Sequence, residues 1–226
     1  MLSLKIARSL LPILDVQDKK MGQEEIWNEL YAGNLTWKKE TVDLPNILRG
    51  KRVLELGVGN GKTLISILKQ RPSNVQAIDF SIKAIEKARK IFKDRKSVTL
   101  LKADAKKMPF PDNSFDVVVV YYILNNSIKK ERFEIIREIY RVLRKSGKCV
   151  FEDFSVNDFR NKGKENRTDK NTVVKKNKLI CHFFEGKEVR GLFDKFSEVK
   201  IKTFLFCPIK HKNNLKREII NCVGKK

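Results

Sequence analysis

The sequence predicts an α/β fold with a Rossmann-like, seven-stranded, mostly parallel sheet that is flanked by helices and has its last strand antiparallel. Two observations lead to this prediction. Short apolar runs alternate with helical segments along the chain, which is the pattern of a doubly wound parallel sheet. The chain also has 226 residues, 41% of them hydrophobic, which suits one domain with a sizeable core.

Seven apolar segments are the predicted strands. In chain order they cover residues 52–56, 74–79, 98–101, 117–122, 148–154, 199–206 and 218–223. The first run ends directly at glycines, as expected of a buried strand that leads into a turn. The last two segments, joined by a basic turn, are expected to close the sheet.

Helices are predicted between these strands because apolar residues recur three and four positions apart. The predicted helices cover residues 62–69, 82–92, 132–143 and 188–193. Ser81 is expected to cap the second of them. Ahead of the sheet, Ile26 and Tyr31 fit one face of a further helix. We therefore divide the chain into an N-terminal helical extension, residues 1–43, and one domain, residues 44–226.

Positive charge is the main peculiarity of the composition. Lys and Arg number 49 against 27 Asp and Glu, which gives a formal net charge of +22. Such a surface attracts nucleic acid electrostatically, although a solvated Lys-rich surface explains the same numbers. Residues 157–178 carry many cations and few apolar side chains, and they are expected to form a mobile basic loop.

The composition argues against a metal centre and a membrane anchor. The four cysteines and two histidines do not cluster as metal ligands do, and reduced thiols are expected in a cytoplasmic protein. Residues 1–14 are apolar, but Pro12 and two basic residues interrupt them, and they are too short to span a bilayer. They also lack a small-residue cleavage site. We expect no stable membrane association.

A glycine-rich turn and three acidic residues mark the predicted site. The glycines within residues 57–61 let the backbone turn tightly and approach a ligand, because no Cβ intrudes. Glu55, Asp79 and Asp104 lie where the first three strands end. In an open α/β sheet the ligand binds outside the carboxyl ends of the strands. The pattern predicts a nucleoside-like ligand, with Asp79 accepting hydrogen bonds from both ribose hydroxyls.

Two other glycine-rich nucleotide sites do not fit. The dinucleotide pattern G-x-G-x-x-G needs a third glycine at position 62, where the chain has Lys62. A phosphate-binding loop that ends in Gly61-Lys62-Thr63 needs a glycine at position 56, where the chain has Leu56. The ligand is therefore neither a dinucleotide nor a nucleoside triphosphate held by such a loop.

Taken together, the motifs resemble class I S-adenosylmethionine-dependent methyltransferases with a type 11-like core. The matching motifs are Glu55-Leu-Gly-Val-Gly-Asn-Gly61, Asp79, Ala103-Asp104-Ala105, Phe110-Pro-Asp-Asn-Ser-Phe-Asp-Val-Val-Val-Val120 and Ile139-Tyr-Arg-Val-Leu-Arg-Lys-Ser-Gly147. The resemblance covers roughly residues 44–154. It implies an enzyme that transfers a methyl group, with S-adenosylmethionine as cofactor.

The resemblance also implies a role for each position. The cofactor-binding residues would be Glu55, Gly57, Gly59, Asn60, Gly61, Asp79, Phe80, Asp104, Ala105 and Tyr121. Among them, Asp79 would hold the ribose, Asp104 and Ala105 the adenine, and Tyr121 would lie near the methionine moiety. The alternative is that the acids cap helices. A sulfonium already activates its methyl group, so alignment of the nucleophile supplies much of the rate and no Ser-His-Asp set is required.

The acceptor side carries a weaker pattern. Residues 121–127 lack the Asn/Asp-Pro-Pro-Tyr element that some nitrogen methyltransferases have after the fourth strand, which argues against that subset. Tyr122 and Asn125 are candidates for facing a substrate, with packing and helix capping as the alternative. Asp153, at the end of the fifth strand, is the candidate for orienting or deprotonating the acceptor, with a capping role as the alternative.

A second resemblance points to RNA. Ile26-Trp-Asn-Glu-Leu-Tyr-Ala-Gly-Asn34 looks like the segment ahead of the domain in tRNA 3-methylcytidine methyltransferases, and 152–184 contains blocks similar to their stretch after the fifth strand. Residues 35–41 depart from that family's pattern. On this interpretation Arg160 contacts the substrate, while Trp37, Tyr122 or Phe184 stacks on an extruded base.

We therefore predict an RNA methyltransferase, with a tRNA base as acceptor and tRNA as partner. Two alternatives stay open: a methyltransferase of a small molecule or protein side chain, and a cofactor-binding protein without catalysis. The sequence does not indicate an oligomeric state.

Overall fold

The structure is a computed structural model that describes residues 22–33, 43–162, 166–175, 177–206 and 216–226. Several sequence predictions fall outside these residues. They concern Trp37, residues 1–21, the departing segment 35–41 and most of the basic turn at 210–217. Everything below concerns the described residues.

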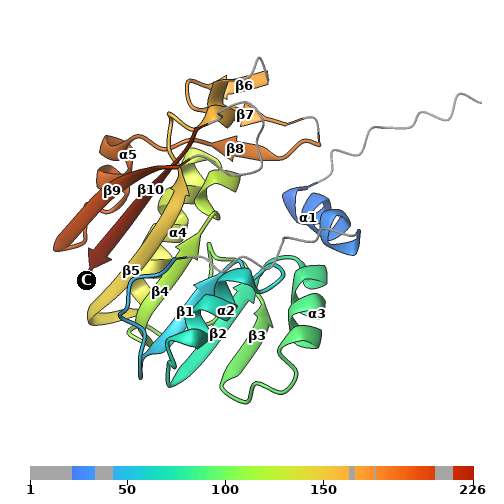
Figure 1. Cartoon of the computed structure of the whole chain (residues 1–226), viewed down its shortest axis with the longest axis vertical. Helices are drawn as coiled ribbons and strands as arrows, with labels where there is room; N and C mark the ends of the chain where they lie inside the picture. Colours follow the sequence, from blue (N-terminus) through green and yellow to red (C-terminus); the bar gives the residue numbers. More distant parts are fainter. Residues whose placement is uncertain (1–21, 34–42, 163–165, 176, 207–215) are drawn as a thin grey trace, which may run out of the picture.

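One seven-stranded sheet forms the centre of the molecule, in the order β3-β2-β1-β4-β5-β10-β9 (Figure 1). The strands are β1 (Arg52–Leu56), β2 (Asn74–Asp79), β3 (Val98–Lys102), β4 (Phe115–Tyr121), β5 (Leu143–Phe154), β9 (Glu198–Phe206) and β10 (Arg217–Lys225). All neighbours in β1–β5 pair in parallel, whereas β10 is antiparallel to both β5 and β9. The predicted fold class is confirmed, including the antiparallel last strand.

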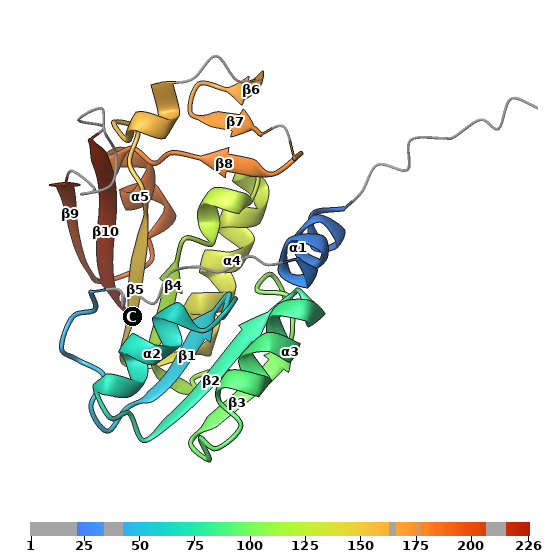
Figure 2. The ribbon, with the colours of Figure 1, turned by 45° about the vertical axis from the view of Figure 1, so that its right-hand side comes forward.

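Helices cover both faces of this sheet. They are α2 (Lys62–Lys69), α3 (Ile82–Ile91), α4 (Lys129–Val142) and α5 (Gly186–Leu192). Alternate residues of the buried strands point to opposite faces, so one core cluster joins the sheet to α2 and α3 and another joins it to α4 and α5 (Figure 2). Ser81 caps α3 as predicted, with its Oγ accepting from the Ala84 N–H at 3.2 Å.

Helix α4 begins earlier than the sequence predicted, at Lys129 rather than at Arg132. The Glu131 carboxylate accepts from the Ile128 N–H at 3.2 Å and thereby satisfies one of the free amides at the helix start. A periodicity search misses such a turn because it is polar and partly exposed.

The largest correction concerns residues 157–178, which were expected to form a mobile loop. The chain there contains a short helix, η2 (Phe159–Lys162), and two strands, β6 (Asn166–Asp169) and β7 (Thr172–Val174). With β8 (Ile180–His182), the two strands make a three-stranded antiparallel sheet, which we call the small sheet (Figure 1). Val173 and Cys181 pack with Phe154 and Phe183 in a separate apolar cluster. Val173 and Cys181 are a cross-strand pair and so share the face of the small sheet that packs on Phe154 of β5.

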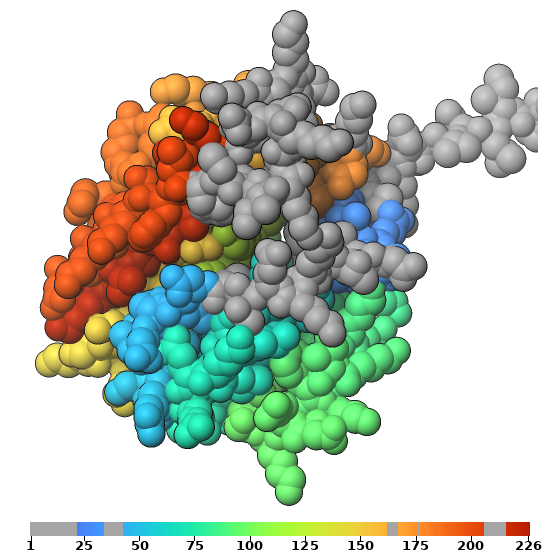
Figure 3. All heavy atoms as spheres, in the orientation of Figure 1, coloured from blue at the N-terminus to red at the C-terminus, as the bar shows by residue number. Residues whose placement is uncertain are grey.

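Helix α1 (Gln23–Ala32) lies apart from the layers, between the outer end of α3 and the small sheet (Figures 1 and 2). Figure 3 shows the same face as spheres, with the small sheet and β9 above and the strands β1 to β3 with their helices below. Within the described residues, no helix is both long and apolar enough to cross a membrane. The same residues hold no group of three or more side chains suited to bind a metal ion.

Candidate active site

The turn after β1 contains three glycines with positive φ angles. The values are +69° at Gly57, +51° at Gly59 and +81° at Gly61, a region that side chains other than glycine seldom adopt. A Cβ at these positions would lie 1.9 Å from Ile123 Cδ1, 2.5 Å from the Tyr31 hydroxyl and 2.2 Å from Phe92 Cε2, respectively. The glycines are therefore needed for close packing of the protein itself, and not only for approach of a ligand as the sequence suggested.

Asp79 closes this turn from the neighbouring strand. Its carboxylate accepts from the Gly59 N–H at 3.0 Å and from the Ser81 N–H at 2.9 Å. Burial raises the pKa of Asp79 to about 6, although these backbone amides favour the charged form. Each carboxylate oxygen has more than one acceptor site, so the group can still receive hydroxyl donors from a ligand.

Glu55 lies beside Asp79 and is only 1% exposed. By hydrogen-bond distance and angle neither of its carboxylate oxygens has a partner among the described residues, although the Leu64 amide lies close enough to act on the carboxyl. Burial is the main cause that raises its pKa, the negative charge of Asp79 adds to it, and the nearby Leu64 amide opposes it only in part. A buried carboxyl without donors is costly for the protein alone, so it fits a ligand that brings hydrogen-bond donors or positive charge.

Helix α1 covers the same turn from outside. The Tyr31 hydroxyl lies against Gly59, and the Trp27 and Tyr31 rings stack at 5.7 Å. Asn28 Oδ1 accepts from the Ser81 hydroxyl at 2.8 Å, and Gln23 Nε2 donates to the Lys178 carbonyl at 3.1 Å. The helix is thus attached to the start of α3 at one end and to the small sheet at the other.

The other predicted cofactor residues are less closely tied to this cluster. The Asp104 side chain is 53% exposed, and its Oδ1 accepts from the Lys106 N–H at 2.8 Å within the turn after β3. Asn60, Phe80 and Ala105 are half-buried. The structure therefore brings Glu55, Asp79 and the glycine turn together and leaves Asp104 at the surface of its own turn.

The chain that follows β4 forms the adjoining part of the site. The Tyr121 hydroxyl donates to the Asp43 carbonyl at 3.1 Å. Tyr122 has a φ of +57°, and its hydroxyl donates to Glu152 Oε1 at 2.5 Å. Its ring also contacts the Phe154 ring, with 5.0 Å between centroids. These contacts hold the turn after β4 against the end of β5.

Asp153, the candidate for deprotonating the acceptor, has another role in the structure. It is 0% exposed, and its oxygens accept from the backbone amides of Asn125 at 3.0 Å and Phe154 at 2.9 Å. It thereby fixes the short helix η1 (Leu124–Asn126), and Asn125 itself is buried. These contacts fit the capping alternative, in which Asp153 holds two backbone amides in the interior.

Two predicted substrate residues are also placed differently from expectation. Phe184 is fully buried, with its ring 5.4 Å from Phe151 and 4.7 Å from His182, so it is a core residue rather than a stacking platform. Arg160 lies over the Phe154 ring at 3.8 Å and binds Asp158 through Nε at 2.8 Å. Arg160 and Tyr122 both contact the Phe154 ring, so the two side chains lie near each other.

Glu152 is the site residue that the sequence analysis did not single out. It faces Tyr121 and Asn221 in the register of β5 with its two neighbouring strands. Adjacent strand residues point to opposite faces, so the two side chains meet different parts of the chain after β4: Glu152 reaches the Tyr122 hydroxyl, and Asp153 reaches the Asn125 amide. The alternation of side chains along β5 was the sequence signal that could have separated Glu152 from Asp153. It does not indicate which face of the strand belongs to the site.

The chain is similar to known proteins in both sequence and fold. Residues 54–151 match the family model described as a methyltransferase domain. The ubiquinone/menaquinone biosynthesis C-methyltransferase UbiE of Azotobacter vinelandii is 33% identical over 150 residues, which are 63% of this chain and 58% of that protein. UbiE of Serratia proteamaculans is 27% identical over 150 residues. The chain thus spans less than two thirds of the length of these curated relatives.

Solved structures show the same fold. A SAM-dependent methyltransferase from Methanosarcina mazei superposes with a TM-score of 0.66 at 20% identity, over 82% of this chain and 99% of that one. The 1,6-didemethyltoxoflavin-N1-methyltransferase of Burkholderia thailandensis, solved with S-adenosylhomocysteine, gives 0.59 at 15% identity, over 90% of this chain and 80% of that one. The predicted class I methyltransferase core is confirmed, and S-adenosylmethionine is the cofactor that it implies.

Proposed function

We propose that this chain, whose residues 54–151 form a class I methyltransferase domain, transfers the methyl group of S-adenosylmethionine to a small-molecule acceptor. One observation carries the methyl-transfer part. Two buried carboxyls, Glu55 and Asp79, lie beside a glycine turn at the carboxyl ends of β1 and β2, and Glu55 has no donor among the described residues. S-adenosylmethionine has ribose hydroxyls and positive charge, which these two groups need.

The residues of the chain divide the work between binding and alignment. Asp79 would accept from the ribose hydroxyls while its amide partners, on Gly59 and Ser81, keep it oriented. Glu55 would meet the cationic methionine end. When bound, the cofactor supplies an already activated methyl group, so the task left to the protein is to place the acceptor in line with it and to exclude water.

The small-molecule class is supported by the curated relatives. Their printed name is that of a C-methyltransferase of ubiquinone and menaquinone biosynthesis. The aromatic side chains that surround the turn after β4 suit a planar acceptor, because Tyr122 packs against Phe154 and Arg160 stacks on that ring.

The free, buried thiols of Cys149, Cys181 and Cys222 are consistent with a cytoplasmic enzyme.

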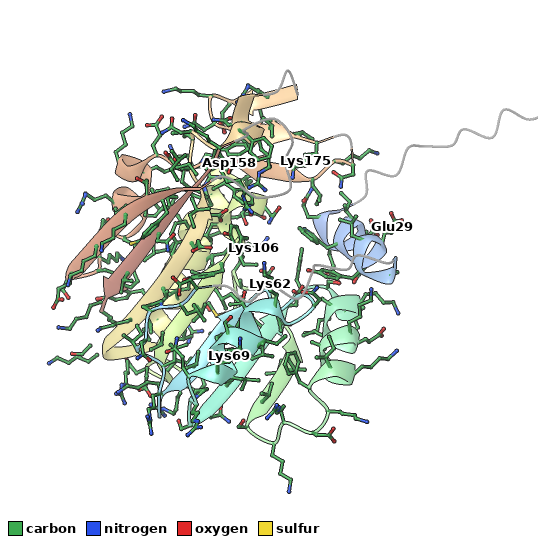
Figure 4. The ribbon with its side chains drawn as sticks, viewed as in Figure 1. Glu29, Lys62, Lys69, Lys106, Asp158 and Lys175 are labelled. Carbon is green, nitrogen blue, oxygen red and sulfur yellow. The ribbon has the colours of Figure 1, made fainter. Side chains whose placement is uncertain are left out.

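RNA is the second candidate acceptor, and the charge favours it. The net charge of +22 suits contact with several phosphates. In Figure 4, Lys62 and Lys106 lie between the small sheet and the lower strands, and Lys175 lies on the small sheet. Lys106 is already bound to Glu131 at 2.7 Å, so its charge is partly used within the protein. A tRNA base stays our prediction for this class.

Labelled methyl transfer tests both candidates at once. The protein and methyl-labelled S-adenosylmethionine are incubated with RNA, protein and small-molecule fractions of a cell extract, and label is counted in each. We expect label in the small-molecule fraction, and none with the Asp79→Ala variant. Label in the RNA fraction that falls steeply with added salt would replace the first acceptor class with the second. Label in no fraction would leave a binding protein without catalysis.

A further inference from the structure

The turn after β4 connects the cofactor side of the site to the end of β5. Ile123 Cδ1 occupies the space above Gly57, where a Cβ would lie only 1.9 Å away. The preceding residue, Tyr122, has a φ of +57°, a strained value for a bulky side chain. Such strain persists only where surrounding contacts impose it, and it is concentrated at functional sites. Tyr122 is therefore held in a set direction, one residue from a contact with the glycine turn.

What holds Tyr122 is Glu152. The Tyr122 hydroxyl donates to Glu152 Oε1 at 2.5 Å, and the Tyr122 N–H donates to the Glu152 carbonyl at 2.9 Å. Glu152 is only 5% exposed, Tyr122 binds its Oε1, and the Asn221 side chain is a further hydrogen-bond partner of the carboxyl. A short bond from a phenol to a buried carboxyl orients that carboxyl and leaves it an acceptor site.

The groups around Glu152 come from several elements. Burial is the main cause that raises its pKa. Tyr122, then Asn221 and Arg217 on β10, favour the ionised form, while Asp43 ahead of β1 opposes it. Asp153 on the same strand and Arg160 on η2 are also charged neighbours of this end of β5, and these two interact with each other. Groups of both charges thus surround this carboxyl and act on its pKa in opposite directions.

We infer that Glu152 accepts the proton that the acceptor loses on methylation, and that Tyr122 positions Glu152 for this step; the inference rests on the proposed function. The acceptor class would then be one with a proton to give up, such as a ring carbon or hydroxyl of a phenol. The acceptor atom forms a bond to the methyl carbon, the sulfur–methyl bond breaks with its electron pair left on sulfur, and the acceptor proton passes to the Glu152 carboxylate and then to water.

Other buried carboxyls in the described part of the chain are less suited to this role. Asp153 is 0% exposed, and its two oxygens hold the Asn125 and Phe154 amides. Asp158 is 0% exposed and bound by Arg160. Glu55 and Asp79 belong to the cofactor side. Glu152 is the carboxyl that combines a position beside the turn after β4 with a phenol partner.

Two variants test the inference in the full chain. Glu152→Gln keeps the shape but cannot take a proton, so we expect the rate of label transfer into the small-molecule fraction of a cell extract to fall roughly 100-fold or more. Tyr122→Phe removes one hydrogen bond, so the rate should fall roughly tenfold. Glu198→Gln is the matched control, because Glu198 is an exposed partner of Lys225. Cofactor affinity by calorimetry should change less than about threefold in all three.

The pH profile separates a proton acceptor from a structural residue. A base must be ionised, so the wild-type rate should rise with pH through the pKa of Glu152 and then level off. This rise should vanish in Glu152→Gln. It should move to higher pH in Tyr122→Phe, because the lost hydrogen bond favoured the carboxylate.

The outcomes of these measurements separate a failure of the proposed function from a failure of the inference about Glu152. Wild-type protein that transfers no label to any fraction would overturn the proposed function and this inference with it. Wild-type transfer together with an undiminished rate and an unchanged pH profile in Glu152→Gln would overturn the inference alone. Should Glu152→Gln bind cofactor more than tenfold more weakly, the residue would belong to the cofactor side instead.

Discussion

The two halves of the candidate site are built differently. The cofactor half, at the ends of β1 and β2, combines backbone amides, glycines and two acids that lie within residues 55–81. The acceptor half, at the ends of β4 and β5, combines side chains from distant segments, such as Tyr122 with Glu152. Local sequence therefore encodes the first half, and long-range packing produces the second. The predictions below test this contrast, from the largest expected effect to the smallest.

The acceptor half should depend on a buried charge network. Arg132 on α4 is 2% exposed, and its Nη2 lies 3.2 Å from Glu188 Oε1 on α5, while His182 Nε2 of the small sheet lies 2.9 Å from Glu188 Oε2. Glu188→Ala leaves the Arg132 charge buried without its carboxylate. We expect the free energy of unfolding in urea to fall by about 3–5 kcal/mol.

The exposed pair of Glu198 with Lys225 provides the control for this network. Glu198→Ala should leave the free energy of unfolding nearly unchanged, because solvent screens this exposed pair. A loss below about 1 kcal/mol for Glu188→Ala as well would show that the network does not hold the small sheet to the helices.

The cofactor half should respond through binding. Asp79→Ala removes the acceptor of the Gly59 and Ser81 amides and of the ribose hydroxyls, so S-adenosylmethionine affinity should fall by more than about 100-fold in calorimetry, or about 2.7 kcal/mol. Asp104→Ala, at an exposed carboxyl, should change it by less than about fivefold. Equal effects of the two variants would contradict the arrangement described above.

The contact between α1 and the glycine turn can be measured by a double-mutant cycle. Gly59→Ala strains a φ of +51° and places a Cβ 2.5 Å from the Tyr31 hydroxyl, so unfolding should become easier by about 1–3 kcal/mol. In a Tyr31→Phe background the hydroxyl is absent, and the same change should cost less. Additive effects would mean that α1 does not pack on this turn in solution.

The buried carboxyl of Glu55 should make the stability of the folded protein depend on pH. Its pKa in the folded protein is raised above the unfolded value, so ionisation favours unfolding as pH increases. Glu55→Gln should therefore stabilise the cofactor-free protein at pH 8, by on the order of 1–2 kcal/mol, and have little effect near pH 4. The same variant should weaken cofactor binding. A loss of stability at pH 8 would show that the carboxylate has a partner in solution.

Much of the fold followed from sequence because its signals are local. The apolar runs of β1 and β2 and the spacing of α2 match the structure at both ends. The small sheet was missed since its strands are short and mostly polar, and only the shared face of Val173 and Cys181 secures it. Strand-end position pointed to both Asp79 and Asp104; Asp79 lies in the buried cluster with Glu55 and the glycine turn, whereas the Asp104 side chain is largely exposed and its role stays a prediction.

The sequence by itself determined the glycine turn and its neighbouring acids, because φ preference and strand-end placement act over a few residues. Only the tertiary structure decided that the Glu152 carboxylate meets the Tyr122 hydroxyl while the Asp153 carboxylate holds the Asn125 amide, and that Tyr31 of α1 lies on Gly59. The physical reason is that adjacent strand residues point to opposite faces, and which face becomes a site depends on what the rest of the chain packs against it.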